Sequence, residues 1–358
     1  MKTLKFIQTD KGQFTASLRK NVTDYFKSRN ISSKGDWKIF VKAVTMLFLY
    51  IVPFILLLLI PMSTWLLFPL SVIMGIGMAG IGMGVMHDAA HGSFSKWPWL
   101  NTVFSSTMYF IGGNTFNWKI QHNLLHHTYT NIEGFDEDID PKGMLRLSPQ
   151  TPLKKIHRFQ YIYAFFLYCL MTISRIFNEF RQLNKYNKRG ITRQQGSTPR
   201  KEMTYLILTK LAYLGVIFSL PIVFTAFSWW IIILGFLTMH FVSGIFMSTV
   251  FQMAHIVEEV KQPVPTPDGC IQNEWTIHEL ETTANFSKKS HFFAWMIGGL
   301  NFQIEHHLFP YISHIHYRAI APIVKSTAIE FGLPYHENKT FFGAIRSHIR
   351  MLKKLGKQ

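Results

Sequence analysis

The sequence predicts an all-α integral membrane protein in which four transmembrane helices form two hairpins beneath a helical cytoplasmic cap. Three observations predict this class: two long windows without basic residues, basic segments on either side of them, and an apolar composition. Of the 358 residues, 48% are hydrophobic and 16% are charged, and the net charge is +17. Soluble chains usually contain more charged residues than this.

The two windows set the number of spans. Residues 44–95 contain no lysine or arginine, and their one charged residue is Asp88. Residues 211–260 also contain no lysine or arginine, and their only charged residues are two glutamates. A spanning helix needs about 20 residues, so the apolar part of each window is long enough for two spans joined by a tight turn. We therefore expect spans at about 44–62, 65–86, 207–226 and 229–252.

Basic loops remain on the cytoplasmic side of a membrane, so both hairpins should enter from the cytoplasm and return to it. Residues 1–43 would form a basic cytoplasmic segment, without a cleavable signal, and residues 44–358 a membrane domain. Both termini would be cytoplasmic, at the inner or plasma membrane of a bacterium or the endoplasmic reticulum of a eukaryote. We name the parts of the domain on that side, residues 87–206 and 253–358, the cap.

Two weaker apolar stretches, 97–118 and 159–174, are expected to lie in the membrane interface or to fold over a buried site. "GIGMAG" (75–80) matches a dinucleotide-binding pattern, but it lies inside a span, where small residues permit close helix packing. The two cysteines, Cys169 and Cys270, support neither a disulfide framework nor a cysteine-based zinc site.

Histidines gather directly after the spans. "MHDAAHGS" places His87 and His91 at the end of the second span, and residues four apart share one face of a helix. "KIQHNLLHHTYTN" repeats this spacing with His122 and His126 and adds His127. All of these histidines are expected on the cytoplasmic face.

The second half of the chain brings further histidines to the same face. His255 follows the fourth span, and "QIEHH" supplies His306 and His307, with Gln303 one turn earlier. Imidazole suits Zn, Cu, Fe or Ni, and a zinc site usually takes three or four protein ligands. Eight histidines exceed the ligands of one ion, so we expect two metal ions, and a nearly all-nitrogen site beside a membrane suggests iron handling oxygen.

The other histidines are isolated. We assign His240, inside a span, to a hydrogen bond there. The rest are assigned by default to surface or packing roles: His157, His278, His291, His314, His316, His336 and His348.

"HDAAH" (87–91), "HNLLHH" (122–127) and "QIEHH" (303–307) resemble the three histidine boxes of the membrane fatty acid desaturases. The glutamine that opens the third box resembles the front-end acyl desaturases, a group that includes linoleoyl-CoA desaturases. "YTNIEGFDEDIDP", "ETTANF" and "GGLNFQIEHHLFP" extend the resemblance over most of residues 85–325.

The resemblance implies a di-iron centre. Its catalytic and metal-binding residues would be His87, His91, His122, His126, His127, His255, His306 and His307. Gln303 stands where stearoyl-type members have a ninth histidine, so it is a candidate weak or water-mediated ligand. Phe251 stands where those members place an asparagine, which leaves that part of the second iron's surroundings open. Candidates to orient the histidines are Asp88, Glu305, Asp136, Glu137, Asp138 and Asp140. The acidic run 136–140 fits a solvated loop equally well.

The resemblance also implies an oxygen-dependent fatty acyl desaturase, which introduces a cis double bond into an acyl-CoA or acyl-lipid chain. O2 would be the co-substrate. Two electrons would come from a separate ferredoxin, flavodoxin or cytochrome b5, because no His-Pro pair of a fused cytochrome b5 domain occurs here. Basic clusters at 181–201 and 349–358 could hold lipid headgroups, acyl-CoA phosphates or an acidic carrier, whereas nucleic acid is not expected.

Two other functions compete with desaturation. A di-iron hydroxylase or ketolase would use the same machinery on a lipid. A metal-ion transporter would place its ligands within the spans along a path, whereas here the histidine clusters follow the spans.

Overall fold

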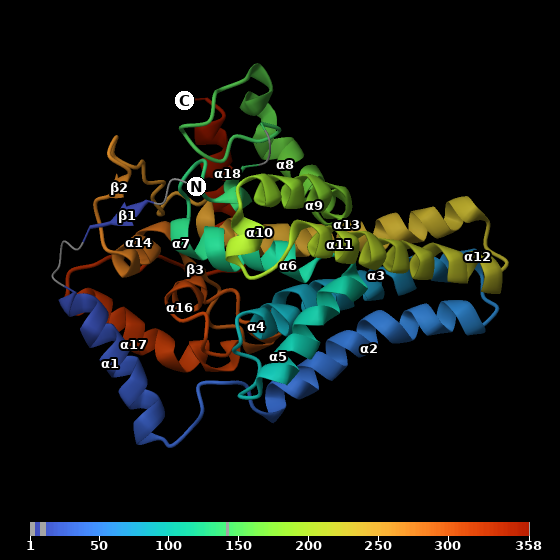
Figure 1. The fold of residues 1–358 in the computed structure, drawn as a ribbon, viewed down its shortest axis with the longest axis horizontal. Helices are drawn as coiled ribbons and strands as arrows, with labels where there is room; N and C mark the ends of the chain where they lie inside the picture. The colour runs from blue at the N-terminus through green and yellow to red at the C-terminus, as the bar shows by residue number, and fades with distance from the viewer. Residues whose placement is uncertain (1–3, 8–11, 141–142, 358) are drawn as a thin grey trace.

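The structure is a computed structural model that describes residues 4–7, 12–140 and 143–357. It is helical apart from two pairs of short parallel strands: β1 (Lys5–Phe6) with β2 (Cys270–Ile271), and β3 (Asn285–Phe286) with β4 (Glu337–Asn338). Long helices extend to the right in Figure 1, and shorter helices gather at their left-hand ends. The part of the chain with the short helices contains the predicted cap.

The first hairpin consists of α2 (Trp37–Leu59) and α3 (Thr64–Gly80). α3 continues through a π-helix, η1 (Ile81–Val85), into α4 (Met86–Ala90). The Asp36 carboxylate accepts a hydrogen bond from the Lys38 backbone N–H at 2.8 Å and thereby caps the start of α2. His87 and His91 therefore lie at the end of one continuous helix formed by α3, η1 and α4.

The second hairpin begins with α11 (Pro199–Leu214), which passes through the π-helix η6 (Gly215–Ser219) into α12 (Leu220–Phe224). α13 (Trp229–His255) returns to the cap and ends at one of the expected ligands. In the described parts of the chain, four helices are long and apolar enough to cross a membrane: Trp37–Leu59, Thr64–Ala90, Pro199–Phe224 and Trp229–His255. The prediction of four apolar helices in two hairpins is confirmed.

The helices begin earlier than the expected spans did at two places. α2 starts at Trp37 rather than at 44, and α11 starts at Pro199 rather than at 207. Basic residues had marked both stretches as loop, but Lys42 is buried and hydrogen-bonded to His314, and the exposed Arg200 and Lys201 lie in the first turn of α11. A lysine with a buried partner can lie within an otherwise apolar helix.

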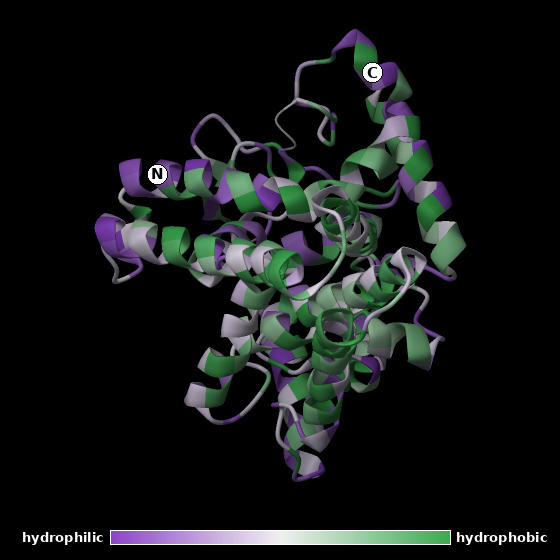
Figure 2. Cartoon of the chain, turned by 90° about the vertical axis from the view of Figure 1, so that its right-hand side faces the viewer, coloured by the Kyte–Doolittle hydropathy of each residue, from purple (hydrophilic) through white to green (hydrophobic). Residues whose placement is uncertain are grey.

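Glycines let the central helices pack closely. A Cβ added to Gly77 would lie 2.6 Å from the backbone nitrogen of Tyr50 in α2, and one on Gly75 would lie 2.6 Å from the carbonyl of Met239 in α13. The "GIGMAG" run therefore serves helix packing. Figure 2 shows hydrophobic colours concentrated on the central helices, which are seen end-on, and hydrophilic colours mainly on the outer ones.

The remaining helices surround the histidine-bearing ends of the hairpins. They are α1 (Gln13–Ser28), α5 (Pro98–Ser105), η2 (Ser106–Ile111), α6 (Thr115–Trp118), η3 (Lys119–His126), α7 (His127–Tyr129), η4 (Glu137–Ile139), η5 (Lys155–Phe159), α8 (Gln160–Cys169), α9 (Met171–Lys188), α10 (Ile191–Gln194), α14 (Trp275–Thr282), α15 (His291–Met296), α16 (Gln303–Leu308), η7 (His314–His316), α17 (Tyr317–Glu330) and α18 (Phe341–Leu355).

The two weaker apolar stretches form short or bent helices. Residues 97–118 fold into α5, η2 and α6, none of which is as long as a span. Residues 159–174 belong mainly to α8 and the start of α9, and the helix pair Lys155–Cys169 and Met171–Lys188 is bent by 78°. If the two helices of this pair are counted together as one span, the number of candidate spans in the described residues rises from four to five.

Candidate metal centre

Five elements, α4, η3, α7, α13 and α16, carry the eight expected ligands into one buried cluster. His87 and His91 lie in and just after α4, and His255 ends α13. His306 and His307 lie in α16. His122 and His126 belong to η3, and His127 follows directly. The cluster therefore joins both hairpins to the cap.

The local structure of η3 differs from the expected α-helix. It is a π-helix, and the His127 backbone N–H donates to the His122 carbonyl five residues earlier. In an α-helix only residues three or four apart share a face, whereas this wider turn also brings His127 over His122. The Nε2 atoms of these two rings lie 3.2 Å apart. Single π-helical turns of this kind are frequent at functional sites.

The ligand atoms fall into two main groups within the described residues. The four-histidine group contains His87, His91, His122 and His306. The three-histidine group contains His126, His255 and His307, and His127 forms a further set with His306 and His307, between the two groups. In each set one nitrogen per ring lies within 4.8 Å of the others. Seven of the eight rings are buried, and His91 is partly exposed.

The free nitrogens fit metal binding. Among the eight clustered histidines, the buried nitrogens without a hydrogen-bond partner are Nε2 of His91, His126, His255, His306 and His307 and Nδ1 of His87 and His127. A buried polar atom without a partner is costly, and metal–nitrogen bonds of about 2.1 Å place neighbouring ligand nitrogens roughly 3 Å apart. His87 Nε2 and His122 Nε2 lie 3.2 Å apart. The donor set therefore suits two ions that prefer imidazole.

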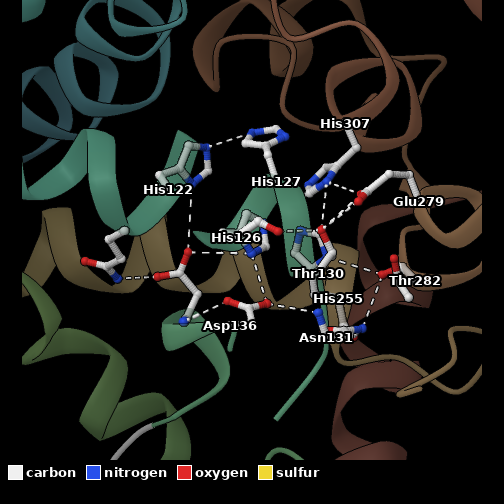
Figure 3. A network of polar contacts seen from close by, with 12 residues as sticks. His122, His126, His127, Thr130, Asn131, Asp136, His255, Glu279, Thr282 and His307 are labelled. Carbon is white, nitrogen blue, oxygen red and sulfur yellow. Dashed lines mark hydrogen bonds and ion pairs between the residues drawn. The ribbon is translucent and has the colours of Figure 1, made fainter. Parts of the chain in front are cut away.

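Carboxylates hold two rings of the three-histidine group, as Figure 3 shows. Asp136 Oδ2 lies 3.0 Å from His126 Nδ1, and Glu279 Oε2 lies 2.7 Å from His307 Nδ1. When Nε2 faces a metal, Nδ1 carries the proton and donates it to the carboxylate. Asp136 also accepts the backbone N–H groups of Asn131 and Asp138 at 2.9 Å. Each ring is thereby fixed in orientation and tautomer.

Other groups hold the remaining rings. His255 Nδ1 lies 3.3 Å from the Thr282 carbonyl, and the Asn131 side chain donates to the His255 carbonyl at 2.8 Å. His306 Nδ1 lies 3.2 Å from the Tyr317 hydroxyl. Neither Tyr317 nor Glu279 was expected from the sequence. Glu279 sits in "HELET" without a neighbouring ligand, so only the fold reveals its role.

The acidic residues expected to orient histidines have different outcomes. Asp136 does so, and Asp138 lies 3.8 Å from His122 Nδ1. Asp88 Oδ1 lies 3.8 Å from His87 Nδ1. Glu137 instead binds Lys185, Gln182 and Tyr186, Glu305 binds Asn285 and Tyr335, and Asp140 lies on the surface. The expectation was therefore wrong for Glu137 and Glu305.

Burial sets the charge of the cluster. Burial lowers the pKa of His122, His127, His306 and His307 well below the usual value, and neighbouring histidines lower it further. These rings are neutral at pH 7, which is the form that binds metal. For His126, burial lowers the pKa but Asp136 and Asp138 outweigh it, so the net shift is upward.

Gln303 and Phe251 lie beside the three-histidine group. Gln303 is buried and its side chain faces His255. The Phe251 ring lies 5.0 Å from the His126 ring and 4.8 Å from the His255 ring, between centroids. The surroundings of the second iron, left open by the sequence at this point, therefore include the apolar ring of Phe251.

The other histidines stay outside both groups. His240 of α13 is hydrogen-bonded, as expected, and its partners are Tyr213 of α11 and Thr172 of α9. His314 departs from its default assignment, because its Nδ1 lies 2.8 Å from Asp88 Oδ2, directly beside the four-histidine group.

Comparison with known proteins decides the family. The family model described as fatty acid desaturase matches residues 63–339. This chain belongs to the fatty acid desaturase family. The desaturase is similar to a sn-1 linoleoyl-lipid 6-desaturase of Synechocystis sp., with 34% identity over 98% of this chain and 97% of the relative.

Further relatives agree. A sn-1 linoleoyl-lipid 6-desaturase of Arthrospira platensis is 30% identical over 96% of this desaturase and 92% of its own length. An acyl-lipid (8-3)-desaturase of Physcomitrium patens is 31% identical over 99% of this chain and 74% of its own length. The desaturase is therefore an oxidoreductase related over nearly its full length to front-end enzymes.

Proposed function

We propose that the protein is an oxygen-dependent acyl desaturase that introduces a cis double bond into the acyl chain of a membrane lipid, with two iron ions held by the eight clustered histidines. One observation carries the proposal: two buried histidine groups have nitrogens aimed at one another in a chain of the fatty acid desaturase family.

The reaction removes one hydrogen from each of two adjacent CH2 groups and leaves a C=C bond. Two electrons and two protons from outside the substrate, together with the two hydrogens removed, convert O2 into two water molecules. An unactivated C–H bond has no acidic proton, so a side-chain base cannot start this reaction. Bound iron supplies the oxidising chemistry together with O2.

The protein's own residues hold and shield the site. The four-histidine group would bind one iron and the three-histidine group the other, with His127 between them. The Trp118 ring stacks on His122 at 4.5 Å, and the Phe251 ring covers His126. Such apolar walls exclude water, which prevents side reactions of the oxidant. Gln303 is a candidate weak or water-mediated ligand on the His255 side.

The substrate is an acyl chain esterified in a membrane lipid rather than acyl-CoA. The support comes from three relatives that carry "lipid" in their names and align with at least 96% of this chain. Their names place the new double bond at position 6 or in the (8-3) class, so a front-end position is proposed here too.

Electrons come from a separate carrier: a ferredoxin, flavodoxin or cytochrome b5. The net charge of +17 and exposed basic residues such as Lys188, Arg189, Lys353 and Lys354 support docking of an acidic carrier on a cytoplasmic cap. Electrostatic steering of this kind weakens as salt is added.

The proposal is tested by expression in a host that lacks polyunsaturated fatty acids. Mass spectrometry of separated lipid classes should find a new double bond, present in intact glycerolipids before it appears in acyl-CoA. His126→Ala and His307→Ala should abolish the product while the protein still inserts. An oxygenated product would instead indicate a hydroxylase or ketolase.

Purified protein gives an independent test. We expect about two iron atoms per chain, and no turnover with O2 and NAD(P)H until a reductase and carrier are added. Initial rates should fall as ionic strength rises. Stoichiometric zinc in active protein, or turnover with NAD(P)H alone, would contradict the proposal.

A further inference from the structure

A buried lysine of the first membrane helix reaches toward the four-histidine group. Lys42 lies in α2 and is 1% exposed. No charged residue follows it in that helix. Its Nζ lies 3.2 Å from His314 Nε2. A charged side chain within a membrane helix is costly and usually has a specific partner and function.

The series of polar contacts continues from His314 to Asp88. His314 Nδ1 lies 2.8 Å from Asp88 Oδ2, and the same oxygen accepts the Ser313 hydroxyl at 3.0 Å and the His314 backbone N–H at 3.1 Å. An ionised carboxylate only accepts, so Nδ1 of His314 carries the proton. Its Nε2 then has a free lone pair and accepts from Lys42. The donors and acceptors of the chain are thus matched from end to end.

Asp88 connects this chain to a ligand. It follows His87 in α4, and its second oxygen lies 3.8 Å from His87 Nδ1. The chain from Lys42 through His314 to Asp88 therefore joins three elements: α2, the start of η7 and α4. It holds α4 through Asp88, the residue next to the ligand His87.

Gly84 makes room for the lysine, and Gly298 packs directly against the backbone of Met83 and Gly84. A Cβ on Gly84 would lie 2.5 Å from Lys42 Nζ and 3.2 Å from the Gly298 Cα. Gly298 has φ +69°, and a Cβ there would lie 2.2 Å from the Met83 carbonyl. The Trp295 ring covers the ammonium at 5.9 Å. The surroundings are therefore shaped around the Lys42 head group.

We propose that Lys42 is a positioning residue, which holds Asp88 through His314 and thereby holds His87 and α4 in the geometry that binds metal in the four-histidine group. An apolar side chain would fill the same space without the cost of burying a charge. The polar chain offsets that cost by fixing the carboxylate beside a ligand. This inference rests on the proposed function, because it requires iron in the histidine groups.

The test compares Lys42→Met with wild-type protein. Wild type should carry about two irons per chain, and K42M should fall toward one, because the four-histidine group loosens and the three-histidine group does not contact the chain. Mössbauer spectra should lose one of two iron components. kcat should fall about tenfold or more, as for other residues behind a ligand, with KM within about twofold.

Two further variants separate positioning from general loosening. His314→Asn interrupts the same chain, so K42M, H314N and the double variant should have similar iron contents rather than additive losses. His314→Asn also tests the link if K42M fails to fold. His240→Met removes another buried polar side chain from a membrane helix and should keep two irons.

The outcomes are distinguishable. K42M and H314N with full iron and kcat within about twofold of wild type would overturn the inference and leave the proposed function intact. Equal iron loss in H240M would also overturn it. Wild-type protein without iron would instead contradict the proposed function itself.

Discussion

Asp136 and Glu137 are neighbours in sequence but contact different parts of the cap. Asp136 is buried and holds His126, while Glu137 binds Lys185 at 2.5 Å and Tyr186 at 2.7 Å. Burial would raise the pKa of Asp136, but His126 and two backbone N–H groups outweigh it and lower the pKa below its usual value. The pair provides a matched test of ligand orientation.

We expect Asp136→Asn to lower iron affinity or activity by about 10–100-fold, because the amide is a weaker acceptor for His126 Nδ1–H. Glu137→Gln should lower thermal stability but keep full iron content. Metal analysis and turnover on both purified variants check this. Equal iron loss in both would show that Asp136 acts through general folding of this loop.

At the level of residues, the sequence predicted all eight clustered histidines because each sits in a motif or at a helix end. It did not predict Glu279, Tyr317 or Lys42. None of the three lies in a motif with the ligand it supports, and side chains of these types are common in surface segments. Only tertiary packing brings them to the site.

At the level of elements, η3 shows what helical spacing cannot predict. The sequence indicated an α-helix with His122 and His126 on one face, and His127 as an addition. The observed π-helix places His127 over His122 as well. The letters of "KIQHNLLHH" fit an α-helix as well as a π-helix, so the sequence does not distinguish the two.

One of the side chains that attach α18 to the site region is a buried histidine. His348 Nε2 accepts from the Tyr168 hydroxyl of α8 at 2.8 Å, and Nδ1 donates to the Ile256 carbonyl, just after His255, at 2.7 Å. Burial lowers the pKa of His348 to about 4. The neutral ring therefore joins α18 to α8 and to the end of α13.

This pKa predicts a pH dependence of stability. Between pH 6.5 and about 4 the unfolded chain binds a proton at His348 and the folded protein does not, so unfolding becomes easier as pH falls. The full difference is roughly 3 kcal/mol. His348→Asn should flatten the unfolding free energy over this window, as measured by thermal melts in detergent at a series of pH values.

The exposed His291 gives the control, since His291→Asn should leave the pH profile of unfolding unchanged. Parallel profiles for wild type and H348N would mean that the His348 ring already charges in the folded protein.

At the level of the whole molecule, the charge-free windows predicted two hairpins correctly but misplaced two helix starts. A charged residue does not by itself exclude a helix. Lys42 lies inside α2, buried and paired with His314, and the exposed Arg200 and Lys201 lie in the first turn of α11. Composition likewise does not decide whether the bent pair α8–α9 lies in the membrane interface or crosses the membrane, since apolar residues suit both positions.

Cysteine labelling settles the topology. In a background with Cys169 and Cys270 replaced, single cysteines at Lys154 and Lys188 flank the bent pair, and one at Lys354 marks α18. All three positions are exposed. We expect all three to be labelled from the cytoplasm by an impermeant reagent. Opposite sides for positions 154 and 188 would show that α8 and α9 cross the membrane.

Each histidine group draws on segments far apart in the chain. The four-histidine group joins positions 87–122 to 306, and the three-histidine group joins 126 to 255 and 307. A bound ion would thus act as a cross-link that closes long loops, and its binding free energy would be folding free energy. Removal of iron should then lower the melting temperature as well as the rate. A cell short of iron would lose folded copies of this protein, in addition to the activity of each copy.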